Sequence, residues 1–145
     1  METAGQLNIF IVDDDPFSLS IYEQHLINLG YGPVQAFESG TACLAALTNI
    51  QADIVFLDHG MEILNGIDVL KKIKRINPDI YVVFISGQDD IQTAINSLKY
   101  GAFDYIVKGD DDLKRIDAAI KKIITVKEML KKRSKSLLKS IFSFL

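Results

Sequence analysis

Short apolar runs alternate along the chain with longer segments of helical period. Five runs rich in β-branched and aromatic residues predict strands at 7–12, 34–37, 54–57, 81–85 and 103–107. Apolar residues that recur every three or four positions predict helices at 16–29, 40–47, 66–76, 90–100 and from 113 onward. The runs IFIV, IVFL and YVVFI are apolar on both faces, as in parallel strands covered by helices. The pattern predicts an α/β fold with a doubly wound parallel sheet and five βα units.

Residues with strong positional preferences support these helix boundaries. Asp15 before Pro16 is typical of a helix N-terminus, and Ser39 can cap the second helix in the same way. Gly30 follows the last apolar turn of the first helix, where a C-terminal glycine is expected. Asn77 precedes a proline and therefore ends the third helix.

Length and composition favour one cytoplasmic domain. The 145 residues, 48% of them hydrophobic and 24% charged, suffice for a single core. No apolar run reaches the roughly 18–20 residues of a membrane span, and the N-terminus lacks the pattern of a signal peptide. The single cysteine, Cys43, excludes an internal disulfide and a cysteine-based zinc site.

Charge is distributed unevenly. Residues 1–107 contain 14 acidic and 5 basic residues, a net charge of −9, whereas residues 108–145 contain 11 basic and 5 acidic residues, a net charge of +6. An acidic body with a basic end favours a cation site in the body, an anionic partner for the end, or both.

Polar residues follow the predicted strands directly. Asp13 and Asp14 follow the first strand, Asp58 the third, Ser86 the fourth and Lys108 the fifth. Ligands of open parallel sheets bind beyond the carboxyl ends of the strands, so we expect these side chains to converge. Crowded carboxylates repel one another unless a cation neutralises them, and Mg²⁺ suits an oxygen donor set of this kind.

The same residues favour phosphoryl chemistry. Lys108 and Ser86 could hold the oxygens of a phosphoryl group beside the carboxylates and the magnesium ion. Asp58 could then attack phosphorus and form an acyl phosphate.

Four segments together resemble the CheY-like receiver domain of two-component response regulators. They are IFIVDDDP, DIVFLDHGMEILNG, VVFISG and YIVK, in the family's order and at its usual spacing. The resemblance implies a flavodoxin-like three-layer sandwich with strand order 2-1-3-4-5. It divides the chain into a receiver domain at 1–130 and an extension of the fifth helix at 131–145.

The resemblance also implies roles for the acidic residues. Asp58 resembles the phosphoacceptor, which receives its phosphoryl group from a sensor histidine kinase or a phosphotransfer protein. Asp13 and Asp14 resemble the acidic pair that holds Mg²⁺, with Asp14 the direct ligand and Asp13 acting through water. Asp58 and the backbone carbonyl of Gly60 would complete the metal site.

The remaining site residues resemble a phosphorylation switch. Ser86 and Tyr105 lie at the positions of the family's hydroxyl and aromatic switch residues, and Lys108 at that of its lysine. The implied function is a single-domain response regulator whose phosphorylation changes binding to a downstream protein. Such a module is not an enzyme that turns over an external substrate.

Two replacements depart from the family pattern. Glu62 stands after Met61, and Gly109 after Lys108, where the family usually has proline. Gly60 and Gln88 occupy positions that tune hydrolysis of the phosphoryl group. These departures leave open a phosphorylation-independent interaction module.

A haloacid dehalogenase-type phosphatase is a further alternative, since it also uses a strand-end aspartate, magnesium, a hydroxyl and a lysine. The sequence supplies its DxD pattern at Asp13 to Asp15. It lacks the threonine or valine that should follow, and nothing in the sequence provides the usual cap domain.

The fifth helix is predicted to outlast the sheet. An apolar seam with two polar interruptions steps by threes and fours through positions 113, 116, 120, 123, 127, 130, 134, 137, 141 and 144. A helix over 112–145 would be about 51 Å long. Its second half could form a homodimer with a second copy, fold back onto the body, or contact an anionic surface. We expect neither membrane contact nor direct nucleic-acid binding, because no helix-turn-helix module fits in the remaining residues.

Overall fold

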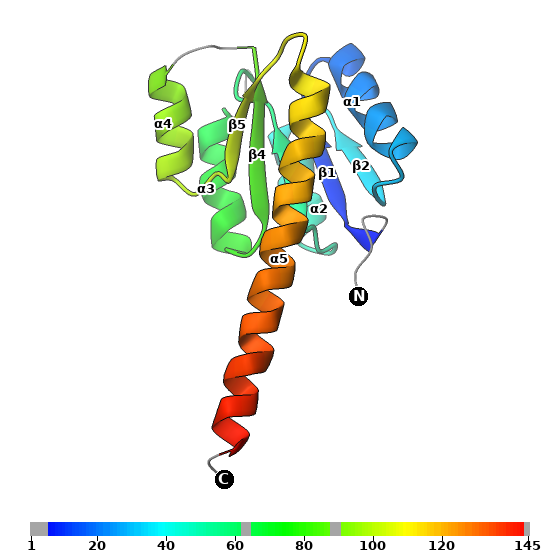
Figure 1. Cartoon of the computed structure of the whole chain (residues 1–145). Helices are drawn as coiled ribbons and strands as arrows, with labels where there is room; N and C mark the ends of the chain where they lie inside the picture. The colour runs from blue at the N-terminus through cyan, green and yellow to red at the C-terminus, as the bar shows by residue number, and fades with distance from the viewer. Residues whose placement is uncertain (1–5, 62–64, 88–90, 144–145) are drawn as a thin grey trace.

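The computed structural model describes residues 6–61, 65–87 and 91–143, which form a five-stranded parallel sheet with helices on both faces (Figure 1). The sheet order is β2-β1-β3-β4-β5, as predicted. The strands are β1 (Ile9–Val12), β2 (Val34–Phe37), β3 (Ile54–Leu57), β4 (Tyr81–Ser86) and β5 (Asp104–Val107). The predicted α/β class, parallel pairing and flavodoxin-like order are therefore confirmed.

The helices form the two outer layers. They are α1 (Pro16–Asn28), α2 (Gly40–Leu47), α3 (Gly66–Ile76), α4 (Ile91–Lys99) and α5 (Asp112–Ser143). Because successive strand residues point to opposite faces, each apolar strand contributes to two cores. On one face Ile9, Ile11 and Phe56 pack with residues of α1 and α5. On the other, Phe10 and Val55 pack with residues of α2 and α3.

Strand register brings the strand ends to one edge of the sheet. Val12 of β1 is paired with Leu57 of β3, and Ser86 of β4 with Val107 of β5. The residues that follow β1, β3 and β5 therefore leave the sheet at the same edge. This alignment positions the site described below.

Side-chain caps fix the starts of three helices. Asp15 accepts a hydrogen bond from the Phe17 amide at 3.2 Å, and Ser39 one from the Ala42 amide at 3.1 Å. Asn65 caps α3 in the same way. Gly30 has a φ of +81°, the left-handed conformation expected of a glycine after a helix. The predicted caps and C-terminal glycine are confirmed.

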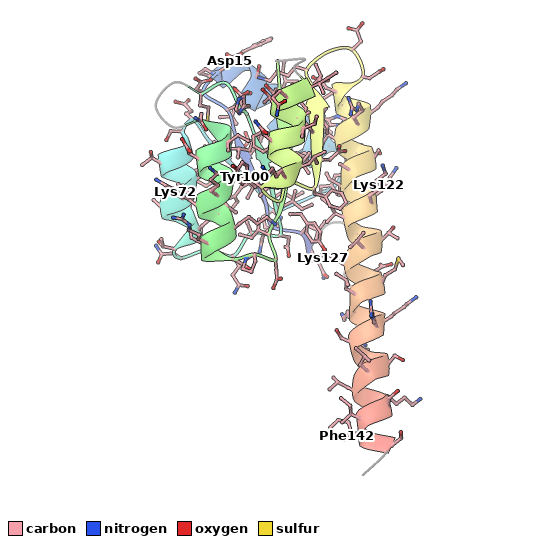
Figure 2. All side chains as sticks on the ribbon, turned by 90° about the vertical axis from the view of Figure 1, so that its left-hand side faces the viewer. Asp15, Lys72, Tyr100, Lys122, Lys127 and Phe142 are labelled. Carbon is pink, nitrogen blue, oxygen red and sulfur yellow. The ribbon has the colours of Figure 1, made fainter. Side chains whose placement is uncertain are left out.

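Helix α5 continues well past the sheet (Figures 1 and 2). Its first half buries Ile116, Ile120 and Ile123 against the sheet. From residue 128 to 143 every residue is exposed, so the alternative in which this segment folds back onto its own body is wrong for these residues. Among the described ranges, no helix combines the length and apolar character of a membrane span.

Four long-range contacts hold α5 against the body. The Tyr22 and Tyr31 hydroxyls of the α1 region donate to Asp112 and Asp117 at 2.8 and 2.6 Å. His25 Nε2 lies 3.2 Å from the Leu113 carbonyl oxygen. Lower down, Lys127 pairs with Asp53 at 2.8 Å, which explains why a lysine interrupts the apolar seam there.

Gly66 at the start of α3 admits no side chain, which gives a first prediction. A Cβ at this position would lie 2.6 Å from a ring carbon of Phe84 and 2.8 Å from the Cα of His59. We expect Gly66→Ala to lower the free energy of unfolding by about 1–3 kcal/mol, the usual cost of overpacking. Urea denaturation measures the change. Gly87→Ala is the control, because a Cβ there meets nothing within 4 Å; equal stability of the two variants would contradict the packing argument.

Candidate functional site

Three aspartates gather at the carboxyl edge of the sheet. Asp13 and Asp14 follow β1, and Asp58 follows β3. One carboxylate oxygen from each lies within 4.8 Å of the other two. Asp13 and Asp58 are buried, whereas Asp14 is exposed. The predicted convergence of these three side chains is confirmed.

Lys108 supplies the positive charge beside these carboxylates. It follows β5, and its backbone amide donates to the Ser86 carbonyl at 2.8 Å, which continues the β4–β5 pairing. Its ammonium donates to Asp13 Oδ2 at 2.8 Å and lies 3.9 Å from Asp58 Oδ2. Burial lowers the pKa of Lys108, but the hydrogen bond to Asp13 and the charge of Asp58 outweigh it and raise the pKa overall. The lysine therefore stays charged.

Asp58 is held in an environment that opposes its ionisation. Burial raises its pKa most, the charge of Lys108 lowers it, and the nearby Asp13 raises it again; the net shift is upward. The Gly60 amide donates to Asp58 Oδ1 at 3.2 Å. Asp58 is thus a partly desolvated carboxylate beside a cation, the setting that activates a carboxylate nucleophile.

Asp13 is fixed by two donors. Besides Lys108 on Oδ2, the backbone amide of Asp15 donates to Oδ1 at 2.9 Å. Asp15 therefore contributes a backbone contact to the site in addition to capping α1. A sequence cannot reveal this contact, because it depends on the turn that residues 13–15 adopt.

The two predicted switch residues lie on β4 and β5. Ser86 ends β4 and is fully buried, adjacent to Lys108 through the backbone. Tyr105 is also buried, and its ring stacks on Phe84 with centroids 6.0 Å apart. Arg115 of α5 donates to the Tyr105 carbonyl at 3.3 Å. Their roles as switches stay predictions. The effect of Glu62 in place of proline and the influence of Gln88 on hydrolysis also stay predictions, and both residues lie outside the described ranges.

The donor set fits a hard divalent cation. Three carboxylates lie close together with one lysine among them, so their negative charge exceeds the local positive charge. Asp14 is exposed, which leaves one side of the cluster open to water. Mg²⁺ takes a few carboxylate ligands and completes its octahedron with water, as this cluster allows. Gly60 lies beside Asp58 through its amide; the role of its carbonyl stays a prediction.

Known proteins are similar in sequence to most of this chain. The transcriptional regulatory protein ZraR of Salmonella typhimurium is 36% identical over 104 residues, which are 72% of this chain and 23% of that protein. The chain thus spans about a quarter of this curated relative. The prediction that it does not bind nucleic acid stays untested.

Solved structures give the same result. A response regulator receiver domain protein from Clostridium thermocellum superposes with a TM-score of 0.78 at 32% identity, over 86% of this chain and 98% of that one. The structure of a CheX-CheY-BeF3-Mg²⁺ complex from Borrelia burgdorferi superposes with a TM-score of 0.76 at 26% identity, covering 81% and 89%. The family model of the response regulator receiver domain matches residues 9–121. With its sheet order and strand-end aspartates, the chain belongs to this receiver family of two-component systems.

Proposed function

We propose that this chain accepts a phosphoryl group on Asp58 from a phosphohistidine of a sensor kinase or phosphotransfer protein, and that the modification switches its binding to a target protein. The observation that carries the proposal is the placement of Asp58 beside Asp13 and Lys108 at one edge of the sheet. A signalling module of this kind carries the phosphoryl group itself and does not turn over an external substrate.

The transfer is an in-line displacement at phosphorus. A carboxylate oxygen of Asp58 forms the new O–P bond while the donor P–N bond breaks, and the electron pair of that bond returns to the imidazole nitrogen. Lys108, 3.9 Å from Asp58, is positioned to neutralise charge on the transferred oxygens. The Ser86 hydroxyl, from the end of the neighbouring strand β4, would donate to one of them.

Mg²⁺ would be held by Asp13, Asp14, Asp58 and the Gly60 carbonyl, and it supplies charge neutralisation of the phosphoryl oxygens when bound. Asp13 is already oriented by Lys108 and by the Asp15 amide. Asp14 is exposed and free of a described hydrogen bond, so it can turn toward a cation without breaking a contact in the described structure.

Exposed apolar residues on α4 favour this helix as the surface that binds the target protein. Four large side chains of this helix and the turn after it are 42–76% exposed: Ile91, Ile95, Leu98 and Tyr100. Exposed apolar side chains gathered on one element favour contact with another protein. Tyr105 lies buried on the adjacent β5, so a change at the site could reach this surface through the strand.

The experiment incubates the purified chain with acetyl phosphate and Mg²⁺ and measures its intact mass. We expect a product heavier by one phosphoryl group, which should not form when a chelator removes magnesium before the incubation. No adduct under any condition would favour the phosphorylation-independent interaction module instead.

Magnesium binding gives a second prediction, with thermal unfolding as the readout. A ligand that binds only the folded state stabilises it by RT ln(1 + [L]/Kd), which is about 2.7 kcal/mol at a ligand concentration of 100 times Kd. We expect MgCl₂ to raise the Tm of the wild-type chain and to have a much smaller effect on Asp14→Asn. NaCl at the same ionic strength controls for screening, and an equal rise in both proteins would exclude Asp14 as a ligand.

A further inference from the structure

The projecting half of α5 carries positive charge that nothing in the described structure neutralises. Residues 129–143, here called the basic arm, contain five basic and no acidic residues. The basic residues are all exposed: Lys131, Lys132, Arg133, Lys135 and Lys139. Within the described ranges none of them forms an ion pair. Figure 2 shows this half of the helix below the body, between Lys127 and Phe142. The basic arm therefore presents its charge to a partner outside the described structure.

The last turns of the basic arm also present a wide apolar face. Four large apolar side chains there are 54–67% exposed: Leu137, Leu138, Ile141 and Phe142. At about 100° per residue they cover an arc of about 140° around the helix. The residues between them are polar and occupy the opposite side: Ser136, Lys139, Ser140 and Ser143. An apolar arc of this width exceeds the narrow seam through which two helices pair, because Leu138 and Phe142 lie beside the seam.

A groove of about 710 Å³ lies where the basic arm leaves the body. Three lysines of the arm line it: Lys131, Lys132 and Lys135. The basic arm of a second copy would bring five more positive charges to this region, and like charges oppose such an association. The charge of the arm and of the groove instead favours an anionic partner.

We propose that the basic arm binds an anionic lipid surface, with its apolar face at the boundary between headgroups and acyl chains and its basic residues on the lipid phosphates. A helix with one apolar face and several lysines is typical of this kind of contact. A nucleic acid would neutralise the lysines but leave the apolar face in water. The expectation of no membrane contact relied on the heptad seam alone, which omits Leu138 and Phe142.

The order of residues along the arm matches the layers of a membrane surface. Four of the five basic residues lie within 131–135, and the four apolar side chains follow within 137–142. Contact with a folded protein requires no such order along the axis. Residues 137–143 form about 10 Å of helix, close to the 5–10 Å to which interfacial helices are buried. Lys139 can reach the headgroups from within this segment through its long side chain.

The body determines how the arm meets the surface. The apolar face continues the face of α5 that buries Ile120 and Ile123 against the sheet, so the body lies on the same side of the helix. The helix therefore cannot lie flat along its whole length. It enters obliquely, with 137–143 deepest and 131–135 at the level of the headgroups. The body then stands off the surface by the turns that carry the lysines.

Vesicle sedimentation with the full chain tests the proposal. The vesicles consist of phosphatidylcholine alone or of phosphatidylcholine with phosphatidylglycerol. We expect the chain to sediment with the anionic vesicles only, and less so at high NaCl, because salt screens the charges. A chain that stays in the supernatant with both kinds of vesicle would overturn the proposal. Equal sedimentation with both would also contradict it, since charge would then play no part.

A pair of charge variants locates the contact on the arm. A lysine near an anionic surface strengthens binding about fivefold, so Lys132→Gln/Lys135→Gln should bind about 30-fold more weakly than wild type. The control, Lys114→Gln/Lys122→Gln, removes the same charge from exposed positions of α5 beside the body. It should bind nearly as well as wild type. Equal losses in the two variants would reduce the effect to net charge and exclude the arm as the site.

A pair of apolar variants tests the face. Leu137→Gln/Ile141→Gln removes half of the apolar side chains while retaining helix propensity, and should weaken binding by about tenfold or more. Met129→Gln is the control, because Met129 is 64% exposed but points about 150° away from the centre of the face. Circular dichroism should show intact secondary structure in both, since these residues are exposed beyond the body. An equal loss in both would exclude the face as the lipid contact.

Fluorescence identifies what covers the face. The chain contains no tryptophan, so Phe142→Trp introduces a single reporter. With anionic vesicles its emission should shift to shorter wavelength and be quenched by lipids brominated in the acyl chains. Met129→Trp, on the other side of the arm, should change much less. A shift of Phe142→Trp without quenching would place this residue against protein, such as a second copy of the chain, and overturn the assignment to lipid.

Discussion

Asp58→Asn is expected to abolish the phosphoryl adduct completely. The amide cannot act as the carboxylate nucleophile, and the other buried carboxylate, Asp13, already binds the Lys108 ammonium at 2.8 Å and the Asp15 amide at 2.9 Å. Intact mass after incubation with acetyl phosphate and Mg²⁺ measures the effect. Peptide mapping of the wild type should place the modification on the peptide that contains Asp58.

Asp13→Asn is the matched comparison, because it removes a carboxylate of the same cluster without removing the nucleophile. We expect a slower reaction with the adduct still on Asp58. An adduct that survives in Asp58→Asn and disappears in Asp13→Asn would favour the haloacid dehalogenase-type mechanism, in which the first strand carries the nucleophile.

Asp58→Asn should also stabilise the fold, by an amount that depends on pH. The folded-state pKa of Asp58 is raised, mainly by burial, so the folded chain binds this proton more tightly than the unfolded chain. Ionisation of Asp58 therefore costs stability as the pH rises from the unfolded pKa, about 3.9, through the folded value. Without Mg²⁺, we expect Asp58→Asn to have a higher Tm than wild type at pH 7. The difference should shrink toward pH 4; a constant difference would exclude this carboxylate as its source.

Lys108→Met should change stability in the opposite direction. The substitution leaves the buried Asp13 without the ammonium that now lies 2.8 Å away, and Asp58 without the same group at 3.9 Å. An unpaired buried group of this kind costs about 1–3 kcal/mol. We expect a loss of that size in urea denaturation without Mg²⁺. Added Mg²⁺ should restore part of it, because the cation replaces the missing positive charge.

An exposed ion pair on helix α5 provides the control for Lys108→Met. Lys121 pairs with Asp117 at 2.9 Å, but its side chain is 69% exposed. Pairs of this kind contribute about 0–1 kcal/mol. Lys121→Met should therefore have little effect and show no rescue by Mg²⁺. A loss as large as that of Lys108→Met would indicate that charge at α5, rather than the strand-end site, determines the stability.

Most of the fold followed from local patterns. The starts of α1, α2 and α3 carry their own signals in Asp15, Ser39 and the apolar period, and the structure confirms them. The starts of two strands were predicted too early. The apolar runs begin at Leu7 and Phe103, whereas the strands begin at Ile9 and Asp104. Apolar residues also precede the residues that form the hydrogen bonds between strands, so hydropathy alone overestimates the length of these two strands.

The site was predictable because parallel strands place their ends together. Asp13, Asp58 and Lys108 are far apart in sequence, yet the βα repeat brings their positions to one edge of the sheet. The supporting contacts were not predictable. Tyr22 reaches Asp112 across 90 positions, and Lys127 reaches Asp53 across 74. Neither pair has a local signal, since each depends on how α5 crosses the sheet.

Helix α5 connects the neighbourhood of the site to a distant end without a break. Its 32 residues extend about 48 Å from a start that lies three residues after the Lys108–Gly109 turn. Its first half is held against the body by the contacts of Tyr22, Tyr31 and Asp53. A bend of about 5° where the helix leaves the body, near Lys127, would displace Ser143 by about 2 Å. A distance probe attached near Ser143 would detect such a bend more easily than one attached near Lys127.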